Sequence, residues 1–177
     1  FTAAESFGGA SVNDRNLGKR NFCDIFVETE TYFTLVFGNH DAEPYSYFGR
    51  ENMGEFYENK EYAHCLFLSG PEDVDGIGNH VIEIKNSDGI ITQGLVMIDS
   101  QAYVKNDIIT SILGNYDNIH DNQVEWYEAE IKRMNSENAE TIKAIQGDEN
   151  GGLWENYGTV KTLAFFHIPL VEMADAW

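Results

Sequence analysis

Three short apolar runs constrain the fold of this chain more than any other feature. They are Thr31–Phe37, Gly94–Ile98 and Leu163–Phe166. A strand that alternates apolar and polar residues can lie half in water, whereas a strand that is apolar throughout needs cover on both faces of its sheet. Helix-like segments separate these runs, and that alternation favours helices layered on a sheet. We therefore predict an α/β fold in a single domain over residues 1–177.

The other elements follow from periodicity and from turn residues. We expect helices at 14–30, 47–60 and 121–134 and strands at 31–37, 64–68 and 160–170. We also expect a β-hairpin with strands at 80–84 and 92–98 around an Asp-Gly turn. Loops are expected at 1–13, 69–79 and 146–152. Asp121 is the expected N-cap of the third helix. Pro169 excludes a helix directly after the last strand.

The charge of the chain limits its partners. Thirty acidic residues against 11 basic ones give a formal net charge of −19. A field of this sign repels nucleic acid and anionic lipid, so we do not expect this chain to bind nucleic-acid duplexes. No run approaches the roughly 20 apolar residues of a membrane span. A phosphorylated ligand fits only where bound cations invert the local potential.

Two further observations concern the cysteines and the chain ends. Cys23 and Cys65 lack the spacing of a metal site, and we expect free thiols that pack as small hydrophobic groups. The sequence opens on Phe1 without an initiator methionine and stops at Trp177, shortly after an apolar strand. We expect it to be an internal portion of a longer protein.

Each of the three apolar runs ends in polar side chains. The first continues into Gly38, Asn39, His40 and Asp41, the second into Asp99 and Ser100, and the third into His167. In open α/β sheets, ligands bind beyond the carboxyl ends of strands, where rigid elements hold polar groups in place. We therefore expect these groups to form one site.

The residue types in this set suit metal chemistry. Asn39 offers a carbonyl oxygen as a neutral ligand, and His167 offers a ring nitrogen. His40 can act as a general acid or a ligand, and Asp41 can hold an imidazole in one tautomer. Gly38 lets the backbone turn and approach a ligand closely. Taken singly, each residue also fits an ordinary turn or a hydrogen-bonded edge histidine.

Five motifs in order along the chain resemble those of the calcineurin-like metallophosphoesterases, the superfamily that includes the purple acid phosphatases. They are "VFGNHD" (36–41), "GIGNHVIEI" (76–84), "VMIDSQAY" (96–103), "NQVEWYEAEI" (122–131) and "AFFHIPL" (164–170). The first resembles the Gly-Asn-His-Asp/Glu motif of the superfamily, and the last resembles the strand-plus-histidine motif of one branch. In the second motif His80 stands where that branch has tyrosine.

The resemblance implies a four-layer α/β/β/α sandwich with two metal ions that share a bridging hydroxide. Asn39 and His167 would ligate one metal, while Gly38 and Asp99 would support the ligands from behind. His40 would stabilise or protonate the leaving oxygen, with Asp41 orienting it. The metals would be iron, zinc or manganese, and the substrate a phosphorylated small molecule or another phosphate mono- or diester.

The chain departs from the superfamily pattern on both sides of these motifs. It contains no Asp-x-His or Gly-Asp motif before residue 38 and no Gly-His-x-His motif after residue 167. None of its five histidines forms a His-x-His pair. The resemblance therefore predicts an incomplete sandwich without its first strands and its last ligand loop. We expect the flanking sequence to encode the missing motifs.

Two alternatives remain open. The fold could serve as a non-catalytic binding or interaction module that has lost its metals; metal analysis distinguishes this from an enzyme. Residues 71–79 could bind calcium, because Asp73, Asp75 and Gly76 match part of an EF-hand spacing. A solvated acidic loop is the simpler account of that segment. A serine hydrolase has no support, since the chain has no Gly-x-Ser-x-Gly motif.

Overall fold

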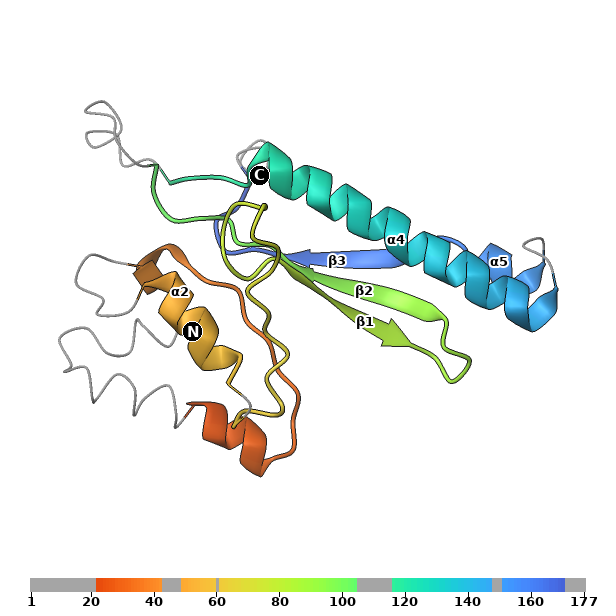
Figure 1. Ribbon diagram of the computed structural model, residues 1–177, viewed down its shortest axis with the longest axis horizontal. Helices are drawn as coiled ribbons and strands as arrows, with labels where there is room; N and C mark the ends of the chain where they lie inside the picture. The colour runs from red at the N-terminus through yellow and green to blue at the C-terminus, as the bar shows by residue number, and fades with distance from the viewer. Residues whose placement is uncertain (1–21, 43–48, 60, 105–115, 148–150, 171–177) are drawn as a thin grey trace.

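The computed structural model describes residues 22–42, 49–59, 61–104, 116–147 and 151–170, and these form a mixed α/β structure (Figure 1). A small mixed sheet contains β1 (His80–Lys85), β2 (Ile91–Met97) and β3 (Lys161–Phe165) in the order β1-β2-β3. The helical elements are residues 22–28, η2 (Asn39–Ala42), α2 (Arg50–Tyr57), α4 (Asp121–Gln146) and α5 (Gly152–Tyr157). The α/β prediction is confirmed at this level.

The predicted hairpin is confirmed, and a single side chain orders its turn. β1 and β2 pair antiparallel from His80 opposite Met97 to Lys85 opposite Ile91. The Asn86 Oδ1 atom accepts the backbone N–H groups of Asp88 and Ile90, both at 3.0 Å. Such Asn side chains replace backbone partners in tight turns.

The parallel pairing of β2 with β3 determines where the polar strand ends lie. Met97 lies opposite Phe165, so the two strands end at the same level. The Ile98 N–H donates to the Phe165 carbonyl at 2.9 Å, and the Ile168 N–H donates to the Ser100 hydroxyl at 2.8 Å. Both carboxyl ends point toward the part of the molecule that contains α2 (Figure 1).

The longest described helix starts at Asp121, as predicted, but differs from its prediction in its N-cap and in its C-terminal end. Its N-cap is His120 rather than Asp121, and the Gln123 side chain accepts the His120 N–H at 2.9 Å. The helix also continues beyond 134 to Gln146, where Gly147 ends it in the left-handed conformation. The extension occurs because the buried positions continue at helical spacing through Asn138 and Ile142.

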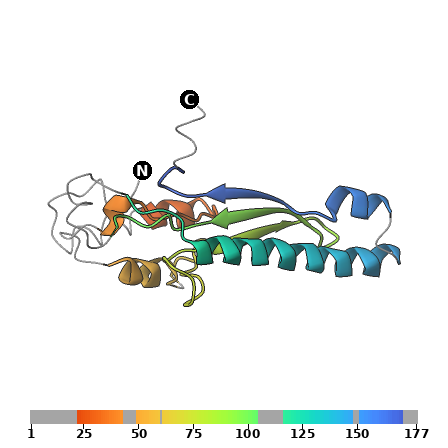
Figure 2. The same ribbon diagram turned by 90° about the horizontal axis from the view of Figure 1, so that it is seen from above.

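Two cores support the structure. Along one face of the sheet (Figure 2), α4 packs Met134 against Ile91 and Val160. Gly94 permits this contact, because a Cβ there would lie 3.0 Å from the Met134 sulfur. The second core lies near α2 and consists of Cys23, Phe33, Phe37, Met53, Tyr57, Tyr62 and Phe67. Cys23 and Cys65 form no disulfide within the described part of the chain.

Two predicted strands are wrong. Residues 31–37 and 64–68 are not assigned as strands; they are joined only by a parallel bridge between Phe33 and Cys65. The Phe33 N–H donates to the His64 carbonyl, and the Leu66 N–H donates to the Phe33 carbonyl. Aromatic packing of Phe33 and Phe37 into the second core, rather than a ladder, accounts for the apolar pattern of the first segment.

The expected cover on both faces of every strand is also wrong for β3. Leu163 and Phe165 are 51% and 45% exposed. Within the described part of the chain, β3 is an edge strand paired with β2 alone.

The remaining boundaries differ from the predictions only in extent. The predicted helix at 14–30 is described from residue 22 and ends at 28, and the helix predicted at 47–60 is α2, Arg50–Tyr57. The predicted loop at 1–13 and most of the acidic loop after Gly147 lie outside the described residues. No helix in the described ranges has the length and apolar character needed to cross a membrane.

Replacing Asn138 with alanine should destabilise the fold. The wholly buried Asn138 amide accepts the Ile91 N–H and donates to the Ile91 and Tyr157 carbonyls, each at 2.8 Å. Its loss leaves these groups unsatisfied, so the free energy of unfolding should fall by about 2 to 4 kcal/mol in urea denaturation. The matched control Ser136→Ala, exposed on the same helix, should change it by less than about 0.5 kcal/mol. An equal effect of both substitutions would contradict this role of Asn138.

Candidate functional site

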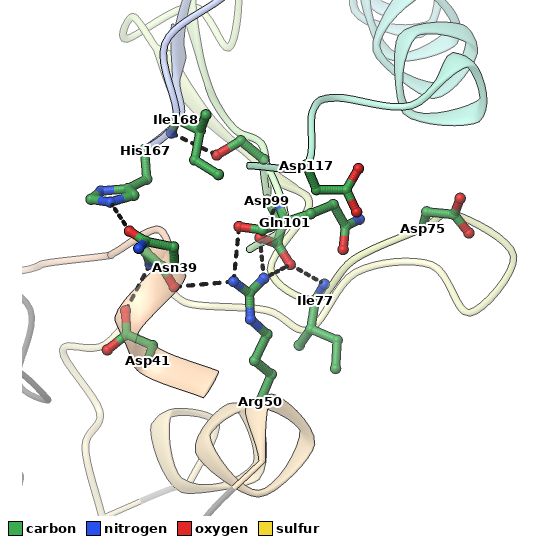
Figure 3. Close-up of polar contacts among 12 residues, drawn as sticks. Asn39, Asp41, Arg50, Asp75, Ile77, Asp99, Gln101, Asp117, His167 and Ile168 are labelled. Carbon is green, nitrogen blue, oxygen red and sulfur yellow. Dashed lines mark hydrogen bonds and ion pairs between the residues drawn. The ribbon is translucent and has the colours of Figure 1, made fainter. Parts of the chain in front are cut away.

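The first and last predicted site segments meet directly. The Asn39 Oδ1 atom lies 2.9 Å from the His167 Nε2 atom, although 128 positions separate the two residues (Figure 3). Asn39 is buried, whereas His167 is exposed. The structure therefore brings together the two residues expected to ligate one metal.

Neighbouring groups determine how Asn39 and His167 face each other. The Asn39 Nδ2 atom donates to the Tyr103 hydroxyl at 2.8 Å, which leaves Oδ1 toward the imidazole. Gly38 lies against the same ring, and a Cβ at this position would be 3.1 Å from the His167 Cε1 and Nε2 atoms. The close approach expected of Gly38 is thus made toward His167.

Asp41 stabilises the turn that carries Asn39. Its Oδ2 atom accepts the Gly38 N–H at 2.7 Å, and its carboxylate is buried. His40, which precedes Asp41 in the 3-10 turn η2, is exposed. The role of Asp41 in orienting His40 stays a prediction, and the structure adds a contact with the backbone that sequence reasoning did not anticipate.

The Asp99 carboxylate contacts three other residues of the site. Its carboxylate pairs with the Arg50 guanidinium and accepts the N–H groups of Ile77 and Gln101 at 2.9 and 3.0 Å (Figure 3). The carboxylate has no solvent exposure. A buried carboxylate is tolerated only when cations and N–H groups pair with it, and Asp99 has both. The predicted role of Asp99 in supporting metal ligands stays a prediction.

Arg50 is the site residue that sequence reasoning missed. It begins α2 and also donates to the carbonyls of Gly38 and Gln101, both at 3.0 Å. The only signal in the sequence is that it is one of 11 basic residues among 30 acidic ones. No local pattern shows which carboxylate such a residue will reach.

Gln101 has an unusual backbone for its residue type. Its φ angle is +64°, in the left-handed region that non-glycine residues rarely adopt. Its Nε2 atom is buried without a hydrogen-bond partner in the described part of the chain. Conformations of this kind persist where surrounding contacts over-determine them, and here Asp99 and Arg50 hold both ends of the residue.

An amide pair joins the hairpin, the end of β2 and the start of α4. The Gln123 Nε2 atom donates to the Asn79 Oδ1 atom at 2.9 Å and to the Asp99 carbonyl at 2.7 Å. The same Asn79 oxygen accepts the Asp99 N–H at 3.1 Å. Three of the five sequence motifs therefore meet at Asp99.

His80 connects the first apolar segment to the hairpin. Its Nε2 atom lies 2.8 Å from the Thr34 hydroxyl, and its Nδ1 atom lies 2.8 Å from the Gly78 carbonyl. Burial lowers the pKa of His80 from its usual 6.5, because the charged ring is disfavoured away from water.

His120 ties the acidic loop to the start of α4. Its Nδ1 atom lies 2.6 Å from Asp75, and its Nε2 atom lies 3.1 Å from Asp117. Hydrogen bonds to the two carboxylates raise the pKa of His120, since both ring nitrogens must carry protons to donate to them. Asp75, part of the suggested calcium loop, is thus already engaged by an imidazole.

A metal site cannot be assigned from clustered side chains alone. Among the described residues, no group of three or more His, Cys, Asp or Glu side chains could hold a metal ion. No protein-family model, curated protein or solved structure matches the chain.

His80 should make the fold less stable at low pH. Because its pKa is lowered in the folded state, the unfolded chain takes up the proton first, and stability falls as pH drops below about 6.5. Urea unfolding of wild type and His80→Gln across that range should show a smaller pH dependence for the variant. Identical slopes for the two proteins would contradict a buried neutral His80.

His120 should have the opposite effect. Its pKa is raised in the folded state, so its contribution is fully present below pH 6.5 and is lost as pH rises through the folded-state pKa. In NMR titration the His120 ring should change protonation above pH 6.5. Relative to wild type, His120→Gln should lose stability at low pH and little at high pH. A ring that titrates at or below 6.5 would rule this out.

Proposed function

We propose that this chain is an incomplete portion of a metal-dependent phosphoesterase that hydrolyses a phosphate mono- or diester. The observation that carries the proposal is the 2.9 Å approach of the Asn39 amide oxygen to the His167 ring nitrogen. Both atoms are of the kinds that bind iron, zinc and manganese. They belong to the two motifs that most closely resemble the metallophosphoesterase pattern.

The residues present fit one part of a metal centre. Asn39 and His167 would contribute two ligands to one ion. Gly38 leaves space beside the His167 ring that a Cβ would fill. We expect the ligands of the second ion to come from the sequence that flanks this chain. The proposed fold is correspondingly the four-layer α/β/β/α sandwich, and the layer of α4 on the sheet supports it.

The bound ions would supply a hydroxide nucleophile and a positive field for the phosphate. The chain's own residues would do the rest. Asn39 is held in one orientation by Tyr103, and the Asp41 carboxylate keeps the turn closed at the Gly38 N–H. His40, exposed on that turn, would donate a proton to the leaving oxygen. The cations would also offset the charge of −19 for an anionic substrate.

One observation favours the alternative of a non-catalytic module. Asn39 and His167 satisfy each other directly, and Asp99 is neutralised by Arg50. The strand ends can therefore hold together without an ion. In that case the same contacts would stabilise a binding or interaction surface.

Metal content and hydrolysis distinguish these functions. The product of the full reading frame should retain iron, zinc or manganese in elemental analysis and should hydrolyse p-nitrophenyl phosphate or its bis-ester. Removing a ligand in Asn39→Ala or His167→Ala should lower metal affinity at least about tenfold, and activity with it. His64→Ala, a histidine outside the site, is the matched control. If the wild-type protein binds none of these metals and hydrolyses neither ester, the enzyme proposal is wrong and the non-catalytic binding module is favoured.

A further inference from the structure

We infer that Arg50 is a positioning residue. Its guanidinium holds the turn that contains Asn39 (η2 and the preceding Gly38, called the Asn39 turn below) next to the carboxyl end of β2. This role concerns the side chains that would ligate the metal and not the ion itself. Its kinetic consequence rests on the proposed function, whereas its structural consequence does not.

The contacts of Arg50 reach three separate segments. Nη1 pairs with the Asp99 carboxylate after β2, while Nη2 donates to the Gly38 carbonyl and to the Gln101 carbonyl, each at 3.0 Å. Figure 3 shows the guanidinium between the Asn39 turn and the Asp99 segment. The Arg50 side chain is 11% exposed. Few other groups could serve three acceptors at once, because a planar guanidinium directs its donors along a fixed fork.

The contact with Gly38 is the one that bears on the site. The Gly38 carbonyl belongs to the peptide that leads into Asn39, and the Gly38 N–H is held by Asp41. The Gly38 carbonyl is thus fixed by a residue outside the turn, and the Gly38 N–H by a residue within it. Since Gly38 is also the residue against the His167 ring, a shift of this peptide moves Asn39 relative to His167.

Stability alone is a poor account of this arrangement. A buried ion pair often contributes little to folding, because desolvation of both charges offsets their attraction. The Arg50 guanidinium contacts two backbone carbonyls in addition to the Asp99 carboxylate. These contacts fix the position of the turn relative to the end of β2. Arg133 provides a contrast: it pairs with Glu83, Glu130 and Glu137 on the surface and is far more exposed.

The first test uses Arg50→Lys with Arg133→Lys as the matched control. A lysine keeps the charge opposite Asp99, so the variant should fold, but it cannot donate to both carbonyls with the same geometry. In ¹⁵N NMR spectra of the isotope-labelled full protein, the Asn39 side-chain amide and the His167 ring nitrogens should shift in Arg50→Lys. They should stay at their wild-type positions in Arg133→Lys. Unshifted Asn39 and His167 signals in a folded Arg50→Lys protein would overturn the inference.

The kinetic test separates positioning from general stability. With p-nitrophenyl phosphate, Arg50→Lys should lower kcat about 10- to 100-fold with KM within about twofold, as expected for small displacements of catalytic groups. Unchanged kcat in the folded variant would overturn the inference. If wild type has no activity, the proposed function fails, and the NMR result alone still decides the role of Arg50.

Chemical rescue provides a second variant. Arg50→Ala removes the guanidinium and leaves Asp99 without its cation, which is expected to destabilise the fold. Methylguanidinium should then raise the melting temperature of Arg50→Ala and return the Asn39 and His167 signals toward their wild-type positions. It should have no such effect on Arg133→Ala. A rescue of stability without any return of these signals would show a merely structural residue and would overturn the inference.

Discussion

The neutralisation of the Asp99 carboxylate is the constraint on which the rest of the site depends. A carboxylate with no exposure to solvent must be paired, and here a guanidinium and two backbone N–H groups do so. Each partner comes from a different segment: Arg50 from α2, Ile77 from the acidic loop and Gln101 from beyond β2. Satisfying one buried charge therefore brings three parts of the chain to the same place, and the Asn39 turn follows because Arg50 also holds it.

Much of the layout could be predicted from the sequence, because hydrophobic periodicity and turn residues report on local structure. The Asp-Gly hairpin, the helix from about 121 and the last strand are examples. The convergence of Asn39 and His167 was predicted from their positions after apolar runs. Apolar runs report burial but not the hydrogen-bond partner, which explains why Thr31–Phe37 was wrongly predicted as a strand. Arg50 could not be found, since its contact with Asp99 spans 49 positions and leaves no periodic trace.

The site combines a rigid base with an open outer side. Asn39, Asp41 and Asp99 are buried and hydrogen-bonded, whereas His40 and His167 are exposed. Asn39 is thus held in one orientation, whereas His40 and His167 are accessible from the solvent side. This division is what a metal-dependent phosphoesterase requires, and it is also compatible with a surface that binds without catalysis. The strongly negative charge of the chain makes cations the natural mediators in either case.

The long span between Asn39 and His167 has a consequence for folding. The hairpin and α4 consist of local contacts, which form early because they close only short loops. The contact between Asn39 and His167 closes 128 positions of chain. The pairing of β2 with β3 also joins segments that are far apart in the sequence. Both contacts therefore carry a larger loop-closure entropy than the hairpin does. The strand ends that carry the candidate site therefore depend more on long-range contacts than the hairpin does.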